Sequence, residues 1–189
     1  HQEDMSERKR YALLTHSTDN IGDDIQSLAA SRLLPSVDAY LDRDHLHSLN
    51  TDNTYDIILH GWFLDKPLNW PPSVALKPMI TSLHISHTAE HHLTSSKSLA
   101  YLKHWEPIGC RDTHTRDLLT RHGIQAYFSG CLSLTLTNPA KKRDDGIYLV
   151  DIFSQGIEPH ELPSWLQEQG TVLTHLTYQP TPLNHFLTR

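Results

Sequence analysis

Short apolar segments alternate with helix-patterned segments along most of this chain, and that alternation limits the fold more than any other feature. Strands that alternate with helices form parallel sheets, because a right-handed crossover returns the chain to the same end of the sheet before each new strand. We therefore predict an α/β fold with a Rossmann-like, open and mostly parallel sheet. The first four apolar segments of strand length are Tyr11–Thr15, Val37–Leu41, Tyr55–His60 and Met79–Ile85.

Helix signals fill the gaps between these strands. Apolar residues recur at helical spacing after Asn20 and again over Ser95–Trp105. Asp112 is placed to cap a helix that runs to His122, with Gly123 as the residue that ends it. Further strands are expected at Pro107–Cys110, Ile124–Phe128 and Leu132–Leu136.

A change in composition marks a domain boundary after residue 137. The segment 138–145 combines a proline with a run of charges, which is typical of a linker. We expect a Rossmann-like N-terminal domain at 10–137 and a partial second Rossmann-like domain at 146–189. The second domain would hold strands at Ile147–Asp151 and Thr171–His175 and a helix between Pro163 and Gly170, which is too little to close a core alone.

Composition excludes several classes of protein. A formal net charge of −6 argues against nucleic-acid binding, and no apolar run approaches the roughly 20 residues that span a bilayer. The two cysteines, Cys110 and Cys131, are too few for a disulfide scaffold and favour a reducing compartment. We expect a cytoplasmic protein that does not span the membrane, which is compatible with peripheral membrane association. The Gly-x-Gly-x-x-Gly pattern of dinucleotide-binding folds does not occur, so no such cofactor is expected.

Polar or small residues follow each predicted strand. The carboxyl ends of parallel strands meet at one edge of a sheet, where ligands bind in open α/β folds. Gly22 would allow close approach of a ligand to the start of a helix, whose free N–H groups attract anions. The alternative is that such loops are polar only because they cap helices. The candidate substrate-binding residues are Asn20, Gly22, Asp23, His60, Trp62, His84 and Arg111.

Four segments together resemble the polysaccharide pyruvyl transferase family and occur in its order. The resemblance implies two Rossmann-like domains that face each other across a cleft, as in GT-B glycosyltransferases. It also implies transfer of a pyruvyl group from phosphoenolpyruvate to sugar hydroxyls of a cell-surface glycan, such as an exopolysaccharide, or of its lipid-linked precursor. Phosphoenolpyruvate would be the donor substrate, with no cofactor. The segments are Asn20–Pro35 (NIGDDIQSLAASRLLP), His60–Phe63 with Trp70–Ser73, Ile108–Thr115 (IGCRDTHT) and Ser129–Leu136 (SGCLSLTL).

The implied reaction needs a general acid, a base and cations that hold carboxylate and phosphate. The candidate residues would serve the acceptor side, where Trp62 either stacks on a sugar or packs against the loop at Trp70. On the donor side, the family carries an Arg-Leu-His motif that does not occur here. We therefore assign no catalytic residue and expect the isolated chain to be inactive. His60 and Ser133 also depart from the family, where Asn and Thr are more usual.

Other functions stay open at this point. A GT-B-like glycosyltransferase that uses a nucleotide sugar would share the fold, and a catalytically inactive binding module would share the missing motif. Unpaired strand edges in the second domain favour a homodimer. The acceptor sugar is not determined by the sequence.

Histidines are unusually frequent, with 15 in the chain. His87 and His91 have the i, i+4 spacing of many zinc sites, and His92 follows them. Thr88 stands where zinc proteases of the His-Glu-x-x-His type carry their general base, so we favour a solvated histidine-rich face and predict no metal.

Overall fold

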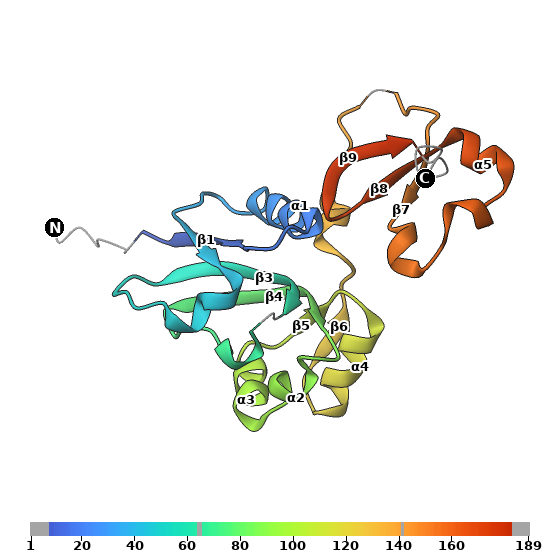
Figure 1. Ribbon diagram of the computed structural model, residues 1–189. Helices are drawn as coiled ribbons and strands as arrows, with labels where there is room; N and C mark the ends of the chain where they lie inside the picture. The colour runs from blue at the N-terminus through green and yellow to red at the C-terminus, as the bar shows by residue number, and fades with distance from the viewer. Residues whose placement is uncertain (1–7, 64–65, 141, 183–189) are drawn as a thin grey trace. The chain divides into compact units, whose positions relative to one another are not determined.

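The computed structural model describes residues 8–63, 66–140 and 142–182. Six strands form one sheet in the order β2-β1-β3-β4-β5-β6, and every neighbouring pair in it is parallel (Figure 1). The predicted α/β class with an open, Rossmann-like parallel sheet is confirmed. The strands are β1 (Arg10–Thr15), β2 (Ala39–Asp42), β3 (Tyr55–Phe63), β4 (Leu76–Ile85), β5 (Ile108–Cys110) and β6 (Ala126–Phe128).

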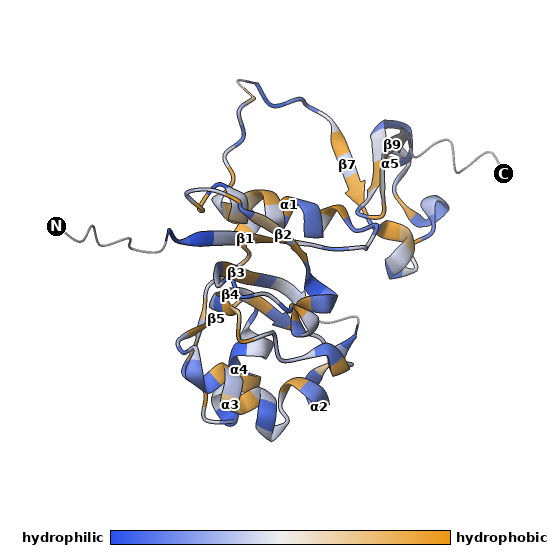
Figure 2. Cartoon of the chain, turned by 90° about the vertical axis from the view of Figure 1, so that its left-hand side faces the viewer, coloured by the Kyte–Doolittle hydropathy of each residue, from blue (hydrophilic) through white to orange (hydrophobic). Residues whose placement is uncertain are grey.

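Helices cover both faces of this sheet, with α1 (Ile21–Ser31) on one side and α2 (Glu90–Leu93), α3 (Ser96–His104) and α4 (Thr113–Arg121) on the other (Figures 1 and 2). Successive strand residues point to opposite faces, so β1 contributes to two cores. Leu13 packs in a cluster with Ala29 and Ala30 of α1. Leu14 belongs to the larger cluster, which includes Leu102 of α3 and Leu119 of α4. Burial on both faces explains the continuous apolar runs at 12–14 in β1 and 57–59 in β3.

The helices α3 and α4 begin and end at the capping residues that the sequence contains. Asp112 caps α4 by accepting a hydrogen bond from the Thr115 N–H at 2.8 Å, as predicted. Gly123 follows the end of this helix with φ +76°, a conformation that glycine adopts without strain. Ser95 caps α3 in the same manner through the Ser98 N–H.

A β-bulge interrupts the pairing of β3 with β4 close to their carboxyl ends. Leu59 pairs with Ile80 and Gly61 pairs with Leu83, so β4 carries one extra residue over this step. Ser82 takes up the irregularity with φ 54° and donates its N–H to Ser129 Oγ. Beyond the bulge the ladder resumes, and Trp62 becomes the neighbour of His84. Bulges of this kind redirect side chains at functional edges of sheets.

The predicted strand at Leu132–Leu136 is wrong, because Leu132–Thr135 forms a short 3-10 turn. Backbone bonds run from Leu134 N–H to Cys131 and from Leu136 N–H to Ser133, so these groups are satisfied locally. Leu132 is buried against the α1 side of the sheet, whereas Leu134 is exposed. The alternating apolar residues of this segment therefore belong to a turn that is held to the core by Leu132, and not to a strand. Further 3-10 turns lie at Arg43–Ser48 and Pro67–Asn69.

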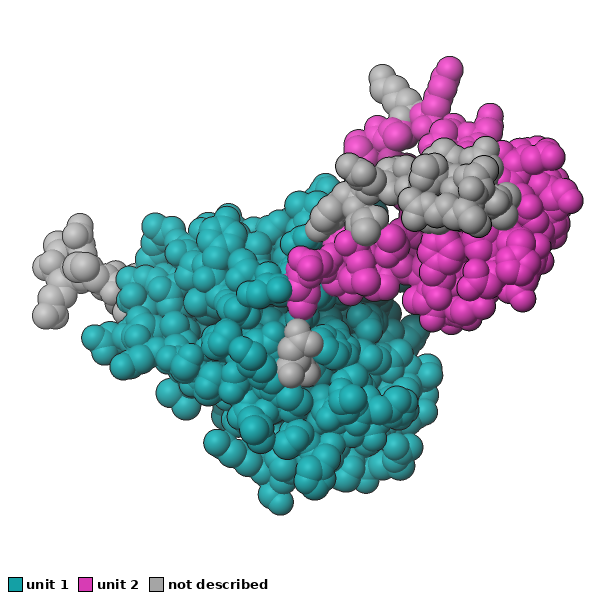
Figure 3. Space-filling view, in the orientation of Figure 1, with its two compact units in different colours: residues 1–17, 23–137 teal, residues 18–22, 138–189 magenta. Residues whose placement is uncertain are grey.

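The chain divides into two compact units, residues 1–17 with 23–137 and residues 18–22 with 138–189 (Figure 3). In the second unit, β7 (Ile147–Val150) and β8 (Gly170–Thr174) are parallel and α5 (Ser164–Gln169) precedes β8. An antiparallel strand that we did not predict, β9 (Thr177–Pro182), completes a three-stranded sheet. Its two prolines obscure the strand pattern, yet proline is tolerated on an edge strand, where β9 lies. Short 3-10 turns occupy Ile152–Gln155 and Pro159–Glu161.

Candidate functional site

A buried ion pair lies near the carboxyl ends of β1, β2 and β3. Arg43 directly follows β2 and is only 3% exposed. Its Nη1 donates a hydrogen bond to Asp23 Oδ1 of α1 at 3.1 Å, and its Nη2 lies 3.9 Å from Asp44 Oδ2. A buried guanidinium requires such carboxylates, because an uncompensated charge is costly away from water. Asp23, in the first turn of α1, therefore faces Arg43.

Trp62 lies against this ion pair. The guanidinium carbon of Arg43 is 5.6 Å from the centre of the Trp62 ring, a cation–π contact. The loop at Trp70 packs elsewhere, since the Trp70 ring meets Phe63 and Tyr101 edge-on at 5.5 and 5.4 Å. Trp62 is half-buried, so part of its surface faces solvent.

His60 is the most deeply buried of the predicted site residues, at 4% exposed. Neither of its ring nitrogens has a hydrogen-bond partner among the described residues. Burial, reinforced by the positive charges of His16 and Arg43, lowers the pKa of His60 from 6.5 to about 4. His60 is therefore a neutral ring among charged groups at pH 7. It is covered, so it presents no surface to a ligand in this conformation.

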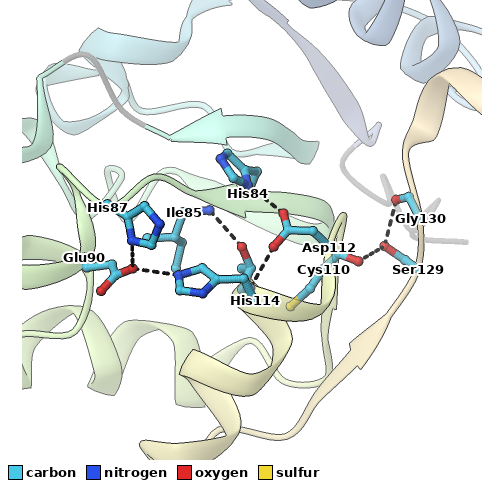
Figure 4. A network of polar contacts seen from close by, with 10 residues as sticks. His84, Ile85, His87, Glu90, Cys110, Asp112, His114, Ser129 and Gly130 are labelled. Carbon is cyan, nitrogen blue, oxygen red and sulfur yellow. Dashed lines mark hydrogen bonds and ion pairs between the residues drawn. The ribbon is translucent and has the colours of Figure 1, made fainter. Parts of the chain in front are cut away.

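A second polar pair joins the ends of β4 and β5 (Figure 4). His84 Nδ1 lies 2.6 Å from Asp112 Oδ2, while the other carboxylate oxygen of Asp112 accepts the Thr115 N–H. Burial raises the pKa of Asp112, but the bonds from Thr115 and His84 hold it below its usual range. A carboxylate on Nδ1 fixes the tautomer of a neutral imidazole and leaves Nε2 as the basic nitrogen. His84 is thus oriented as acid–base groups in enzymes are.

Arg111 directly follows the buried strand β5 in the chain and precedes Asp112. Its N–H donates to the Leu83 carbonyl at 2.8 Å, and its side chain is half-buried. The preceding residue, Cys110, is fully buried, and burial raises the pKa of its thiol to about 12. Cys110 and Cys131 are both free thiols, and Cys110 is too weakly acidic to act as a nucleophile.

Asn20 and Gly22 form a turn of their own. The Gly22 N–H donates to Asn20 Oδ1 at 2.8 Å, and a methyl group at Gly22 would lie 2.9 Å from the same oxygen. Both residues belong to the second compact unit. The first unit thus groups Asp23, His60 and Trp62 around one arginine, and places Trp62, His84 and Arg111 at the ends of consecutive strands.

Arg43 is the main site residue that our sequence analysis missed. Asp42, Arg43 and Asp44 follow the predicted strand Val37–Leu41, so the rule that selected the other loops also applied there. Asp42 caps the turn by accepting the Asp44 N–H at 2.9 Å. The signal in the sequence was the run of three charged residues, Asp42, Arg43 and Asp44, directly after an apolar strand.

Comparison with protein families places this geometry in context. The family model of polysaccharide pyruvyl transferases matches residues 20–178, which is most of the chain. The chain belongs to the polysaccharide pyruvyl transferase family. The match confirms the resemblance and indicates a transferase of polysaccharide biosynthesis. No curated protein and no solved structure matches the chain. None of the helices in the described residues is long and apolar enough to cross a membrane.

Proposed function

We propose that this chain provides the acceptor side of an enzyme that transfers a pyruvyl group from phosphoenolpyruvate to a sugar of a cell-surface glycan or its precursor. In this reaction the enol carbon–carbon double bond takes up a proton and the carbon–oxygen bond to phosphate breaks. Two hydroxyls of one sugar bond to the same carbon, giving a pyruvate ketal and free phosphate. One hydroxyl proton balances the new methyl group and the other leaves with phosphate.

The pairing of His84 with Asp112 carries this proposal. Attack by a sugar hydroxyl requires a base, and an imidazole whose Nδ1 is held by a carboxylate offers Nε2 for that task. The pair lies at the carboxyl edge of the parallel sheet, where this class of fold binds its ligands. We assign His84 as the acid–base group for the acceptor and Asp112 as the residue that positions it.

Trp62 and Arg111 flank His84 and suit a sugar acceptor. Trp62 is the neighbour of His84 across the β3–β4 ladder, and Arg111 follows the next strand. An aromatic ring offers a flat surface to the C–H face of a sugar, and an arginine offers several hydrogen-bond donors to its hydroxyls. Because Arg43 already contacts Trp62, the tryptophan ring is held in place before any ligand binds.

Acceptor binding to the purified chain tests this proposal. Short oligosaccharides with two free hydroxyls on one sugar are titrated while tryptophan indole and histidine ring signals are followed by NMR. We expect shifts at Trp62 and His84, and affinity about tenfold weaker in Trp62→Ala, a loss of about 1.4 kcal/mol. Trp165→Ala is the matched control, since Trp165 is an exposed tryptophan of the second unit. Equal affinity in both variants would refute the proposal, and selective binding of a nucleotide sugar would favour a glycosyltransferase.

The donor side predicts a second result. Phosphoenolpyruvate carries a carboxylate and a phosphate, and the Arg-Leu-His motif by which the family is expected to hold it does not occur in these 189 residues. We therefore expect no phosphate release when this chain is incubated with phosphoenolpyruvate and acceptor glycans. Turnover above the rate without protein would contradict that expectation.

A further inference from the structure

Three side chains with metal-binding atoms meet on the surface beside α4 (Figure 4). His87 lies in the turn after β4, Glu90 is the first residue of α2, and His114 lies in the first turn of α4. Glu90 Oε1 lies 2.8 Å from His87 Nδ1 and 2.6 Å from His114 Nε2. The two imidazole rings meet edge-on, with their centroids 4.7 Å apart and their planes inclined by 62°.

We propose that His87, Glu90 and His114 bind a divalent transition-metal ion of the zinc type. Two imidazole nitrogens and one carboxylate oxygen form a donor set that zinc adopts in proteins, whereas calcium and magnesium prefer oxygen ligands alone. Three protein ligands leave the fourth tetrahedral position to water. This site is separate from the proposed acceptor site and does not depend on it.

The distances fit an ion with little rearrangement. Zinc lies about 2.0–2.2 Å from nitrogen and oxygen ligands, so tetrahedral ligand atoms are roughly 3.4 Å apart. The three ligand atoms here all lie within 4.8 Å of one another. His87 and His114 are exposed, so rotation of their side chains is enough to bring the nitrogens into range. Among the described residues, no other group of three histidine, cysteine or acidic side chains meets this criterion.

The cluster of His87, Glu90 and His114 differs from the His87–His91 pair that the i, i+4 spacing in the sequence suggested. His87 precedes α2, which begins at Glu90, so His87 and His91 do not share a helix. The His91 ring packs instead against the His92 ring, with centroids 5.6 Å apart. The third ligand, His114, comes from a helix 24 residues farther along the chain than Glu90.

An ion at this position would join two segments that also hold the His84–Asp112 pair. His87 follows His84 by three residues, and His114 follows Asp112 by two. The end of β4 with the turn that follows it, and the N-terminal end of α4, therefore carry both features, as Figure 4 shows. Because the three ligands come together only in the folded chain, we expect Zn²⁺ to bind the folded state more tightly than the unfolded one and to stabilise it.

Calorimetric titration of the full chain with Zn²⁺, after removal of trace metal by a chelator, tests the proposal. The chain has 15 histidines, so matched controls are needed to separate this site from weak surface binding. We expect one site whose affinity falls by on the order of tenfold or more in His87→Ala, His114→Ala and Glu90→Gln. His91→Ala on α2 and His122→Ala at the end of α4 should bind as the unchanged chain does, and Mg²⁺ should give no comparable heat.

Two further measurements keep the result interpretable. Amide NMR spectra establish that each variant is folded, and Co²⁺ in place of Zn²⁺ reports the ligands through its visible absorption. We expect a tetrahedral Co²⁺ spectrum and a Zn²⁺-dependent rise in melting temperature, both lost in folded His114→Ala and kept in His122→Ala. Equal Zn²⁺ affinity in the ligand variants and the controls would overturn the proposal, as would a Co²⁺ spectrum that His114→Ala leaves unchanged.

Discussion

Arg43 shows how single residues at the sheet edge depend on one another. Its guanidinium is buried with Asp23 on one side, Asp44 on another and the Trp62 ring against it. Removal of one partner from a buried ion pair typically costs about 3–5 kcal/mol, because the other charge stays buried without compensation. His60 shares this environment without a charge of its own, since burial favours its neutral form.

The buried ring of His60 makes stability depend on pH. Its pKa falls from 6.5 in the unfolded chain to about 4 in the folded chain, so the unfolded state binds the extra proton between these values. The contribution is fully present above about pH 6.5 and is lost as the pH falls toward 4. We expect about 2 kcal/mol of unfolding free energy to be lost between about pH 7.5 and 5.

Substitution of His60 isolates this effect. His60→Asn should remove most of that pH dependence in urea unfolding followed by circular dichroism. The carboxylates with lowered pKa values, such as Asp112, act in the opposite part of the range, since their contribution is lost only as the pH falls below about 4. His91→Asn, at an exposed position, is the control and should follow the unchanged chain. Parallel pH profiles for His60→Asn and the unchanged chain would contradict the prediction.

At the level of secondary structure, the bulge between β3 and β4 lies where the sheet meets α1. Gly61 adopts φ +84° within β3, and its α-carbon faces Gln26 of α1. The strand can therefore turn at the bulge while the helix stays close. A side chain at this position would have to displace the Gln26 side chain.

Two glycines with the same sign of φ allow this packing to be measured. A methyl group at Gly61 would lie 3.1 Å from Gln26 Oε1, whereas one at Gly123 would meet no atom within 4 Å. Both substitutions force alanine into a left-handed conformation, which costs roughly 1–2 kcal/mol. We expect Gly61→Ala to lower the free energy of unfolding by about 1 kcal/mol more than Gly123→Ala, because the added methyl group also displaces the buried Gln26 side chain. Equal losses in urea unfolding would show that strain alone matters at Gly61.

At the level of the whole molecule, the two compact units differ in how much core each has. In the second unit, the buried hydrophobic cluster of the described residues consists of Ile152 and Val172, with Leu149 and Leu162 packed against it, and Pro159 is buried as well. Strand β7 is almost entirely hydrophobic in Figure 2, yet Tyr148 and Val150 are exposed. So small a core contributes little stability. The GT-B-like arrangement of two domains stays a prediction. The homodimer is also a prediction, and light scattering would measure it.

Hydrogen exchange on the full chain tests this difference. We expect amides of β7 and β8 to exchange at least about tenfold faster than those of β3 and β4, because local opening of the second unit exposes less apolar surface. The comparison is internal to one sample, so β3 and β4 serve as the control. Equal protection of both sheets would mean that the second unit opens only when the whole chain unfolds.

The sequence by itself determined the local architecture of this protein. Alternating apolar and helical segments predicted the parallel sheet, and Asp112 and Gly123 predicted the ends of α4, because these signals act between residues close in the chain. The family resemblance likewise rested on short segments in order, and the family match confirms it.

Only the tertiary structure decided which distant side chains meet. Arg43 joins Asp23 across 20 residues, His84 joins Asp112 across 28, and His114 joins Glu90 across 24. The order and register of the parallel strands bring these loops and helix ends together, and they leave no periodic signal in the sequence. The environment of His60 is of the same kind, because the charged groups that act on its ring, His16, Asp23 and Arg43, come from the loop after β1, from α1 and from the turn after β2.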